Sequence, residues 1–251
     1  MRRRIPYRFV FLLIAVGGLI VAANLWKSRL TVDDIRVEGN RVVDTNEILQ
    51  LAHVRAGAKL YDLDLMAIRN DVLSHDFIRD VTVERDLPST LIIRVTERSP
   101  IAMVNRSGIR YLDQDGVVLP QSLSRELFDL PVISNIDPGV LLAVGSRVRN
   151  SDVLEGLHIL VTARAVSKEL YHLLSEVRLR NGGDIVLYAT DGGLPIIYGH
   201  GDAAGKLVCL DTFWKEIIRQ RGFGALQYVD LRFEDQIVVR WSASTKVMRT
   251  S

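Results

Sequence analysis

The stretch FIRDVTVERDLPSTL at residues 77–91 decides the fold of the first part of the chain. Val81 and Val83 alternate with polar residues, and the apolar residues from Leu91 onward do the same. An alternation with a period of two predicts strands that are buried on one face. The tetrapeptide DLPS at 86–89 lies between the two runs and contains residues that favour a tight turn. The stretch therefore predicts two strands joined by a turn.

The residues upstream of this hairpin predict one strand and two helices. Residues 32–38 alternate loosely and end at Gly39-Asn40, which is typical of a strand followed by a turn. Asp44 and Glu47 have the spacing of a capping box before a short helix. Asp64 can cap a second helix that runs to about residue 73. The order strand, helix, helix, strand, strand predicts a small α+β unit with both helices on one face of a sheet.

Several motifs in this region resemble one known domain. The motif VEGN at 37–40, the stretch 77–91 and the motif ERSPIA at 97–102 resemble the POTRA domain as it occurs in the FtsQ/DivIB family of cell division proteins. That family usually has Trp where this chain has Leu87, which is a conservative departure. The resemblance implies a POTRA domain over residues 30–99. In that domain we expect Gly39 and Pro88 to serve the framework.

The remainder of the chain predicts a second domain over residues 100–242. Short alternating runs predict several strands, and apolar residues at helical spacing predict helices at 152–166 and 203–220, capped by Asp152 and Asp202. Two final strands are predicted at 228–233 and 237–241. The motif YVDLRF at 228–233 resembles the last but one strand of the same family. The predicted fold class is thus α+β, with a POTRA domain followed by a mixed β domain with flanking helices.

The N-terminal residues predict a membrane anchor. Residues 9–26 contain no charge, and 18 residues of helix extend over about 27 Å, which is close to the thickness of a bilayer core. Four arginines precede this run, whereas only Lys27 and Arg29 follow it closely, so residues 1–8 are expected in the cytoplasm. A cleaved secretory signal that ends at Val21-Ala22-Ala23 is the alternative. In both cases the bulk of the chain faces an extracytoplasmic space, and the polar residues 243–251 are expected to be disordered.

The charge distribution argues against nucleic acid as a ligand. Six of the 32 Lys and Arg residues lie within residues 1–29, where there is no acidic residue. The remaining 26 face 30 Asp and Glu residues, so the rest of the chain has a formal charge of −4. A protein that neutralises phosphates needs a basic surface, which this composition does not favour.

No motif for catalysis, for a cofactor or for a small-molecule substrate is recognised in the sequence. The five histidines are scattered, and Cys209 matches no spacing of metal ligands. Cys209 is expected to be a small apolar residue on a helix. The motif GHGD at 199–202 precedes a predicted helix, but Asp202 would repel a phosphate there while it caps the helix. We therefore predict a protein that is not an enzyme and has no metal or cofactor.

The final strands are the predicted binding site. A C-terminal strand is often a sheet edge, whose free N–H and C=O groups can accept an added strand. In the resembled family this region receives the partner FtsB. The resemblance assigns that contact here to Phe233, Glu234, Asp235, Gln236, Val239 and Trp241. The basic residue that the family carries ahead of an earlier strand has no direct match, because residues 174–176 read LSE; Arg178 or Arg180 could replace it.

The resemblance also implies a function. The family is a scaffold that links early cytoplasmic and late periplasmic division proteins, binds FtsB and FtsL, and helps control septal peptidoglycan synthesis. Its members are single-pass inner-membrane proteins at the division septum, with the bulk of the chain in the periplasm. Two other classes stay open on the sequence. One is an envelope enzyme or peptidoglycan-binding module, and the other is a POTRA-containing secretion or assembly component.

Overall fold

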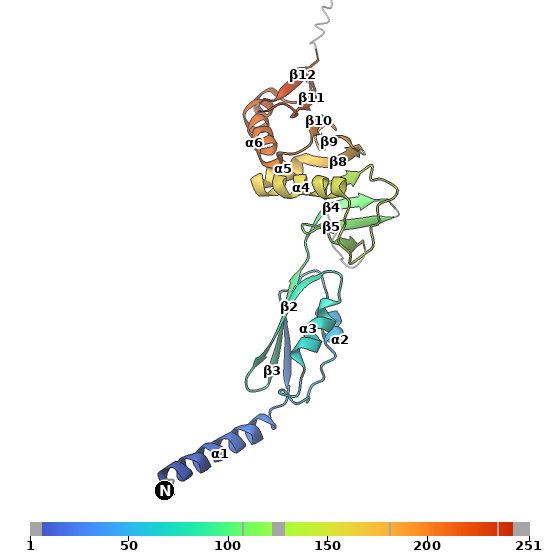
Figure 1. Cartoon of the computed structure of the whole chain (residues 1–251). Helices are drawn as coiled ribbons and strands as arrows, with labels where there is room; N and C mark the ends of the chain where they lie inside the picture. Colours follow the sequence, from blue (N-terminus) through green and yellow to red (C-terminus); the bar gives the residue numbers. More distant parts are fainter. Residues whose placement is uncertain (1–6, 107, 122–128, 181, 235, 243–251) are drawn as a thin grey trace, which may run out of the picture. The chain divides into compact units, whose positions relative to one another are not determined.

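The computed structural model describes residues 7–106, 108–121, 129–180, 182–234 and 236–242, and the chain divides into two compact units (Figure 1). The first unit ends at Glu97, and the second begins at Arg98. The predicted tail at 1–8 lies almost wholly outside the described residues, and the predicted disordered tail at 243–251 lies outside them entirely.

The N-terminal apolar segment forms helix α1, Tyr7–Lys27. Its large apolar side chains, among them Phe11, Ile14 and Leu19, are exposed. Among the residues that the structure describes, no helix is both long enough and apolar enough to cross a membrane. The segment is therefore helical as expected, but the predicted transmembrane span at 9–26 is not confirmed.

The folded part of the first unit has the predicted order of elements. These are β1 Asp34–Glu38, α2 Thr45–Ala52, α3 Leu65–Leu73, β2 Ile78–Asp86 and β3 Thr90–Glu97. Strand β3 lies in the middle of the sheet, parallel to β1 and antiparallel to β2. Helices α2 and α3 cover the same side of this sheet (Figure 1). The apolar residues that alternate along β3 are buried against them, which explains why residues 77–91 determine the unit.

Both predicted helix caps in this unit are formed. Asp44 accepts a hydrogen bond from Asn46 N, and Asp64 accepts from Met66 N and Ala67 N. The predicted reciprocal half of the capping box is wrong, because the Glu47 carboxylate lies 3.2 Å from the His75 ring nitrogen Nε2 instead. That contact joins α2 to the residues that follow α3, so Glu47 contributes to tertiary structure rather than to the helix end.

The turn after β1 is fixed by a glycine and a carboxylate. Gly39 has a φ of +87°, and a Cβ at this position would overlap the Val95 carbonyl oxygen. The residues after this turn donate three backbone N–H groups, those of Arg41, Val42 and Val43, to the Glu97 carboxylate. The Glu97 carboxylate at the end of β3 thus holds the residues after the turn, and Val95 leaves no room for a side chain at Gly39.

The described strands of the second unit form one nine-stranded mixed sheet, in the order β12-β11-β10-β9-β8-β7-β4-β5-β6. Three of the pairings are parallel, namely β4 with β7, β7 with β8, and β10 with β11. The others are antiparallel. The bounds are β4 Pro100–Asn105, β5 Ile109–Asp113, β6 Val118–Pro120, β7 Val132–Ser134, β8 Leu174–Arg180, β9 Gly183–Ala189, β10 Pro195–Gly199, β11 Leu226–Asp230 and β12 Val238–Trp241.

The helices of the second unit pack on one another and on the middle of the sheet. Helix α4, Ser151–Val166, contacts α5, Lys168–Leu173, and α6, Ala203–Phe213, as well as strands β4, β7 and β8. The core between them consists of aliphatic residues with two buried tyrosines, Tyr171 and Tyr198. Burial raises the pKa of the Tyr171 phenol to about 12, and its hydroxyl donates to Ile101 O at 2.7 Å.

Two helix predictions in this unit need correction. Asn150, not Asp152, caps α4, because its side-chain oxygen accepts from Val153 N at 3.0 Å. The predicted continuous helix at 203–220 is interrupted, since α6 is followed by the π-helical turn η1, Trp214–Ile218, and by α7, Arg219–Arg221. A π-helical turn inserts one residue into the helical repeat, which a search for a 3.6-residue period does not detect. Asp202 caps α6 as predicted.

Candidate functional site

Strand β12 is an edge of the nine-stranded sheet. It pairs antiparallel with β11, with Tyr228 opposite Arg240 and Asp230 opposite Val238, and β11 is its only neighbour in the part of the chain that the structure describes. The expectation that a C-terminal strand forms an edge is therefore confirmed. One row of backbone donors and acceptors on β12 faces away from the sheet.

The direction of these donors follows from one hydrogen bond. Ser242 N donates to Ala225 O at 2.7 Å, so the N–H of residue 242 points toward the β11 side. Backbone N–H and C=O groups alternate in direction along a strand. Residues 240 and 238 consequently face β11, whereas the N–H and C=O groups of Val239 and Trp241 face outward. The register shift between β11 and β12 lies at residues 226–228 and leaves this alternation along β12 intact.

The six predicted site residues fall into three groups. Val239 and Trp241 are partly buried and pack with their side chains against the core of the unit. Phe233 is 50% exposed, and Glu234 and Gln236 are exposed as well. Asp235 lies outside the described residues. The two aromatic residues therefore differ, because Trp241 has a role in the core while Phe233 projects from the surface.

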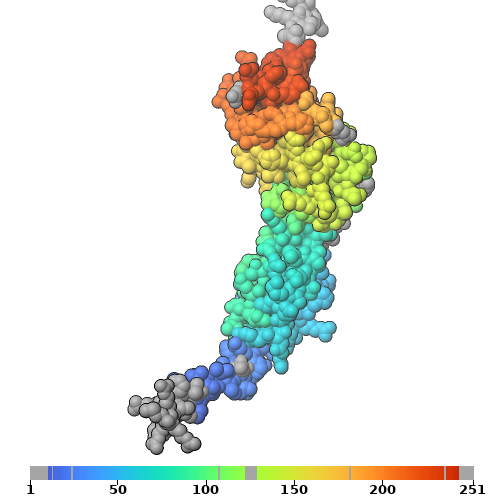
Figure 2. All heavy atoms as spheres, viewed as in Figure 1, coloured from blue at the N-terminus to red at the C-terminus, as the bar shows by residue number. Residues whose placement is uncertain are grey.

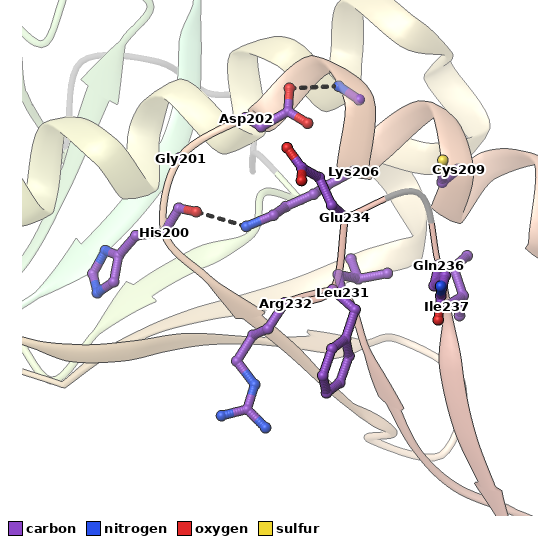
Figure 3. A pocket seen from close by; sticks show the side chains of 12 residues that line it. His200, Gly201, Asp202, Lys206, Cys209, Leu231, Arg232, Glu234, Gln236 and Ile237 are labelled. Carbon is purple, nitrogen blue, oxygen red and sulfur yellow. Dashed lines mark hydrogen bonds between the residues drawn. The ribbon is translucent and has the colours of Figure 1, made fainter.

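Phe233, Glu234 and Gln236 line a pocket of about 560 Å³ between the start of α6 and the loop 231–237 (Figure 3). Figure 3 shows Lys206 of α6 and Glu234 of the loop among the side chains that line this pocket. Neither Val239 nor Trp241 is among its lining residues. The predicted residues are thus divided between a pocket and the adjoining strand edge.

Arg232 fixes the point at which the loop leaves β11. Its guanidinium lies 2.7 Å from the Asp230 carboxylate and 2.9 Å from the Asp184 carboxylate on β9. The hydrogen bond from Arg232 holds the pKa of Asp230 below its ordinary value, although burial of Asp230 opposes the shift. This pair of side chains was not predicted from the sequence. The signal for it was the spacing of two, which places both side chains on one face of a strand.

The opposite wall of the pocket is the turn at residues 199–202. The Glu155 carboxylate of α4 lies 2.9 Å from His200 Nδ1 and accepts from Gly201 N at 3.0 Å. Lys206 Nζ donates to the carbonyl oxygens of Tyr198 and His200. The hydrogen bond to Glu155 raises the pKa of His200, and the contacts with Gly201 and His200 lower the pKa of Glu155 against the effect of its burial. These hydrogen bonds tie the turn to α4 and to the first turn of α6.

Arg178 and Arg180, the two residues that could replace the family's basic residue, lie far from β12 in the sheet. Arg178 on β8 stacks 4.7 Å from the centre of the Tyr188 ring and pairs with Glu176 at 3.0 Å. Three strands separate β8 from β12, and four steps between adjacent strands amount to about 19 Å. Arg180 is exposed at the end of β8. A partner that reached both Arg178 and the β12 edge would have to cross the face of the sheet.

The described residues contain no group of three or more His, Cys, Asp or Glu side chains that could hold a metal ion. Asp202 caps α6 by accepting from Gly205 N at 3.2 Å. Its carboxylate therefore occupies the helix end where an anion would bind. Cys209 lies on α6 as predicted, but it is exposed rather than packed in a core.

Comparison with known families gives two adjoining matches. The model of the family described as "POTRA domain, FtsQ-type" matches residues 30–98. The model described as "Cell division protein FtsQ/DivIB, C-terminal" matches residues 102–232, which is just over half of the chain. The second match ends at the start of the loop that lines the pocket, so β12 lies beyond it.

Curated relatives match over most of the chain, and each is called "Cell division protein FtsQ". The protein of Syntrophotalea carbinolica is 29% identical over 96% of this chain and 90% of its own length. The protein of Geotalea daltonii is 30% identical over 82% of this chain and 74% of its own length. The protein of Rhodothermus marinus is 29% identical over the whole chain and 92% of its own length.

Proposed function

Because the chain belongs to the FtsQ/DivIB family of cell division proteins, we propose that it acts in the division machinery as a scaffold whose β12 edge receives a strand from a partner. The expected partner is FtsB, bound together with FtsL. In this role the protein links early cytoplasmic components to late periplasmic ones and helps control septal peptidoglycan synthesis. It acts by binding and not by catalysis.

The observation that carries this proposal is the free edge of β12. Val239 and Trp241 direct their N–H and C=O groups away from β11, and an extended partner segment can satisfy them. Phe233, Glu234 and Gln236 lie beside this edge and would supply the choice of partner. Asp235 completes the proposed site by its place in the sequence. The backbone thus contributes affinity, and the adjacent side chains contribute specificity.

The proposal includes the membrane. The family implies a membrane-associated location at the division septum. We place residues 9–26 in the inner membrane with the N-terminus in the cytoplasm and the two folded units in the periplasm. This is supported by the uncharged run, by the arginines that precede it, and by the exposed apolar side chains of α1.

A test of the edge compares two variants of one residue, Val239→Pro and Val239→Ala. Proline removes the outward N–H of residue 239, whereas alanine keeps this donor and loses only methyl groups. The full chain in detergent micelles would be titrated calorimetrically with the periplasmic segment of FtsB. We expect Val239→Pro to weaken binding at least tenfold, about 1.4 kcal/mol, and Val239→Ala to weaken it much less.

Melting curves provide the control for this test. Proline is tolerated at an edge position whose N–H faces solvent, so Val239→Pro should melt close to Val239→Ala. Equal affinity of both variants would remove the strand addition from the proposal. If FtsB bound the wild-type chain at none of the concentrations tested, the partner assignment itself would fail.

A further inference from the structure

Two hollows lie on either side of an exposed leucine in the second unit. A hollow of about 810 Å³ is lined by Arg147 and Arg149, and one of about 360 Å³ is lined by Arg106 and Arg110. Leu141 lines both hollows, as do Val140 and Ala143, and we call this exposed leucine the apolar ridge. We call these four arginines and Leu141 the arginine–leucine surface. The loop 137–149 that carries most of it contributes the yellow-green surface in Figure 2.

The backbone fixes two of the arginines in a common direction. Residues 145–148 bond to residues 116–118, with Gly145 N donating to Val118 O at 2.8 Å and Val148 N donating to Gly116 O at 2.9 Å. The Val148 side chain is buried, and in an extended segment its two neighbours point to the opposite side. Arg147 and Arg149 therefore both face outward from a hydrogen-bonded segment, and both are exposed.

Leu141 is 85% exposed although the residue before it is fixed. Val140 is buried, its N–H donates to Asp137 O, and its carbonyl accepts from the Arg106 guanidinium. The loop is thus anchored directly beneath the leucine. A single exposed leucine is ordinary on a protein surface, so the significance of Leu141 comes from the arginines that line the same hollows.

The charges of this surface are unbalanced. Within the described parts of the chain, no salt bridge pairs any of the four arginines with a carboxylate. Asp137 is the acidic residue that lines the larger hollow, and its carboxylate accepts from Gly139 N. Guanidinium groups bind carboxylates through two parallel hydrogen bonds, and repulsion among the four cations falls when an anion joins them.

We propose that the arginine–leucine surface binds an acidic segment of a partner protein that carries an apolar residue between its carboxylates. The acidic side chains of one peptide could enter the two hollows while its apolar residue contacts Leu141. A lipid surface does not present charged and apolar groups in this alternating order. Arg106, Arg110 of β5 and the loop 137–149 form this surface, and no residue of β12 lines either hollow. Binding at this surface is a second interaction, distinct from the proposed strand addition at β12, and it can be tested independently.

A double variant tests the proposal. The full chain in detergent micelles would be mixed with a fluorescein-labelled peptide Asp-Glu-Leu-Glu-Asp, and binding would be followed by fluorescence anisotropy. Arg147→Gln with Arg149→Gln should weaken binding about tenfold and should make the remaining affinity less sensitive to salt. The matched control is Arg219→Gln with Arg221→Gln, which removes two exposed arginines of the same spacing elsewhere in the unit and should leave binding unchanged.

The apolar ridge has its own pair of variants. Leu141→Asn should weaken peptide binding severalfold, whereas Val208→Asn, at another exposed apolar residue of the same unit, should not. The proposal is overturned if the peptide does not bind, if both arginine pairs have the same effect, or if the neutral peptide Asn-Gln-Leu-Gln-Asn binds equally well. Binding to phosphatidylglycerol vesicles that depends on Arg147 and Arg149, without binding of the peptide, would assign the surface to lipid and would also overturn it.

Discussion

Replacement of Gly39 should lower the stability of the first unit more than replacement of another glycine with a positive φ. Its positive φ disfavours any side chain, and a Cβ would also overlap the Val95 carbonyl oxygen. Gly57 has a similar φ of +82°, but a Cβ there would meet no atom within 4 Å among the described residues. We expect Gly39→Val to destabilise the chain by about 3 kcal/mol and Gly57→Val by about 1 kcal/mol.

Thermal unfolding of both glycine variants by circular dichroism checks this difference. Binding of FtsB to each folded variant serves as the control, since neither glycine lies in the second unit. Equal melting temperatures for the two variants would show that the overlap with Val95 relaxes freely. An unaltered melting temperature together with lost recruitment of Gly39→Val to the septum would contradict the framework role.

Phe233 and Trp241 should separate binding from stability. Phe233 is half exposed, so Phe233→Ala should cost at least about 2 kcal/mol of FtsB binding, roughly thirtyfold, and less than about 0.5 kcal/mol of stability. Trp241 packs against the core, and Trp241→Ala should cost about as much binding and in addition about 1–2 kcal/mol of stability. Calorimetric titration and melting curves measure both quantities. Wild-type affinity of Phe233→Ala would exclude the loop from the site.

At the scale of elements, the turn at 199–202 should respond to pH. The pKa of His200 is raised above its ordinary value of about 6.5, chiefly by the hydrogen bond to Glu155, with Asp184 adding to the shift. A raised pKa stabilises the fold below the unfolded pKa, and that stabilisation is lost as the pH rises through the folded pKa. The wild-type chain should therefore exceed His200→Asn in stability near pH 6, and the difference should shrink above pH 7.

Melting temperatures between pH 5.5 and pH 8.5 give this difference directly. His158→Asn removes another exposed histidine of the same unit and is the control for the loss of an imidazole as such. A difference between wild type and His200→Asn that grows with pH would reverse the assigned role of Glu155.

The elements that the sequence predicts well are those with local signals. Asp44, Asp64 and Asp202 cap helices as expected because capping depends on residues two or three positions away. Asn150 and Asp152 are both residue types that cap helices. Asn150 is the cap because the preceding loop ends there and α4 begins at Ser151. Strand β10 has no clear signal in the sequence, because it begins with Pro195 and continues as a short apolar run without alternation.

The candidate site was predictable only in part. The edge position of β12 follows from its place at the end of the second domain, and the aromatic positions follow from the family resemblance. The separation of the site residues between the pocket and the strand edge could not be predicted from the sequence. It depends on packing between α6 and the loop 231–237, and these two segments are far apart in the sequence. The ion pairs of Arg232 with Asp184 and of His200 with Glu155 also join distant elements.

At the scale of the whole molecule, topology is the property to test. If the proposed topology is correct, a periplasm-active reporter fused after residue 242 should be active, because arginines that precede an uncharged segment favour a cytoplasmic N-terminus. Replacing Arg2, Arg3, Arg4 and Arg8 by glutamate should reduce the reporter activity. An inactive reporter on the wild-type chain, or a mature protein that begins near Asn24, would contradict the anchor.

The place of β12 in the sheet also determines when, during synthesis, the protein can first bind its proposed partner. Strand β12 is the last strand along the described chain and the outermost in its sheet, and it pairs with β11, the strand made just before it. Chains emerge from the ribosome at about 5–20 residues per second, N-terminus first. A nascent chain that ends before residue 238 therefore has no β12 edge, so the proposed partner can join only molecules whose synthesis has passed the entire sheet.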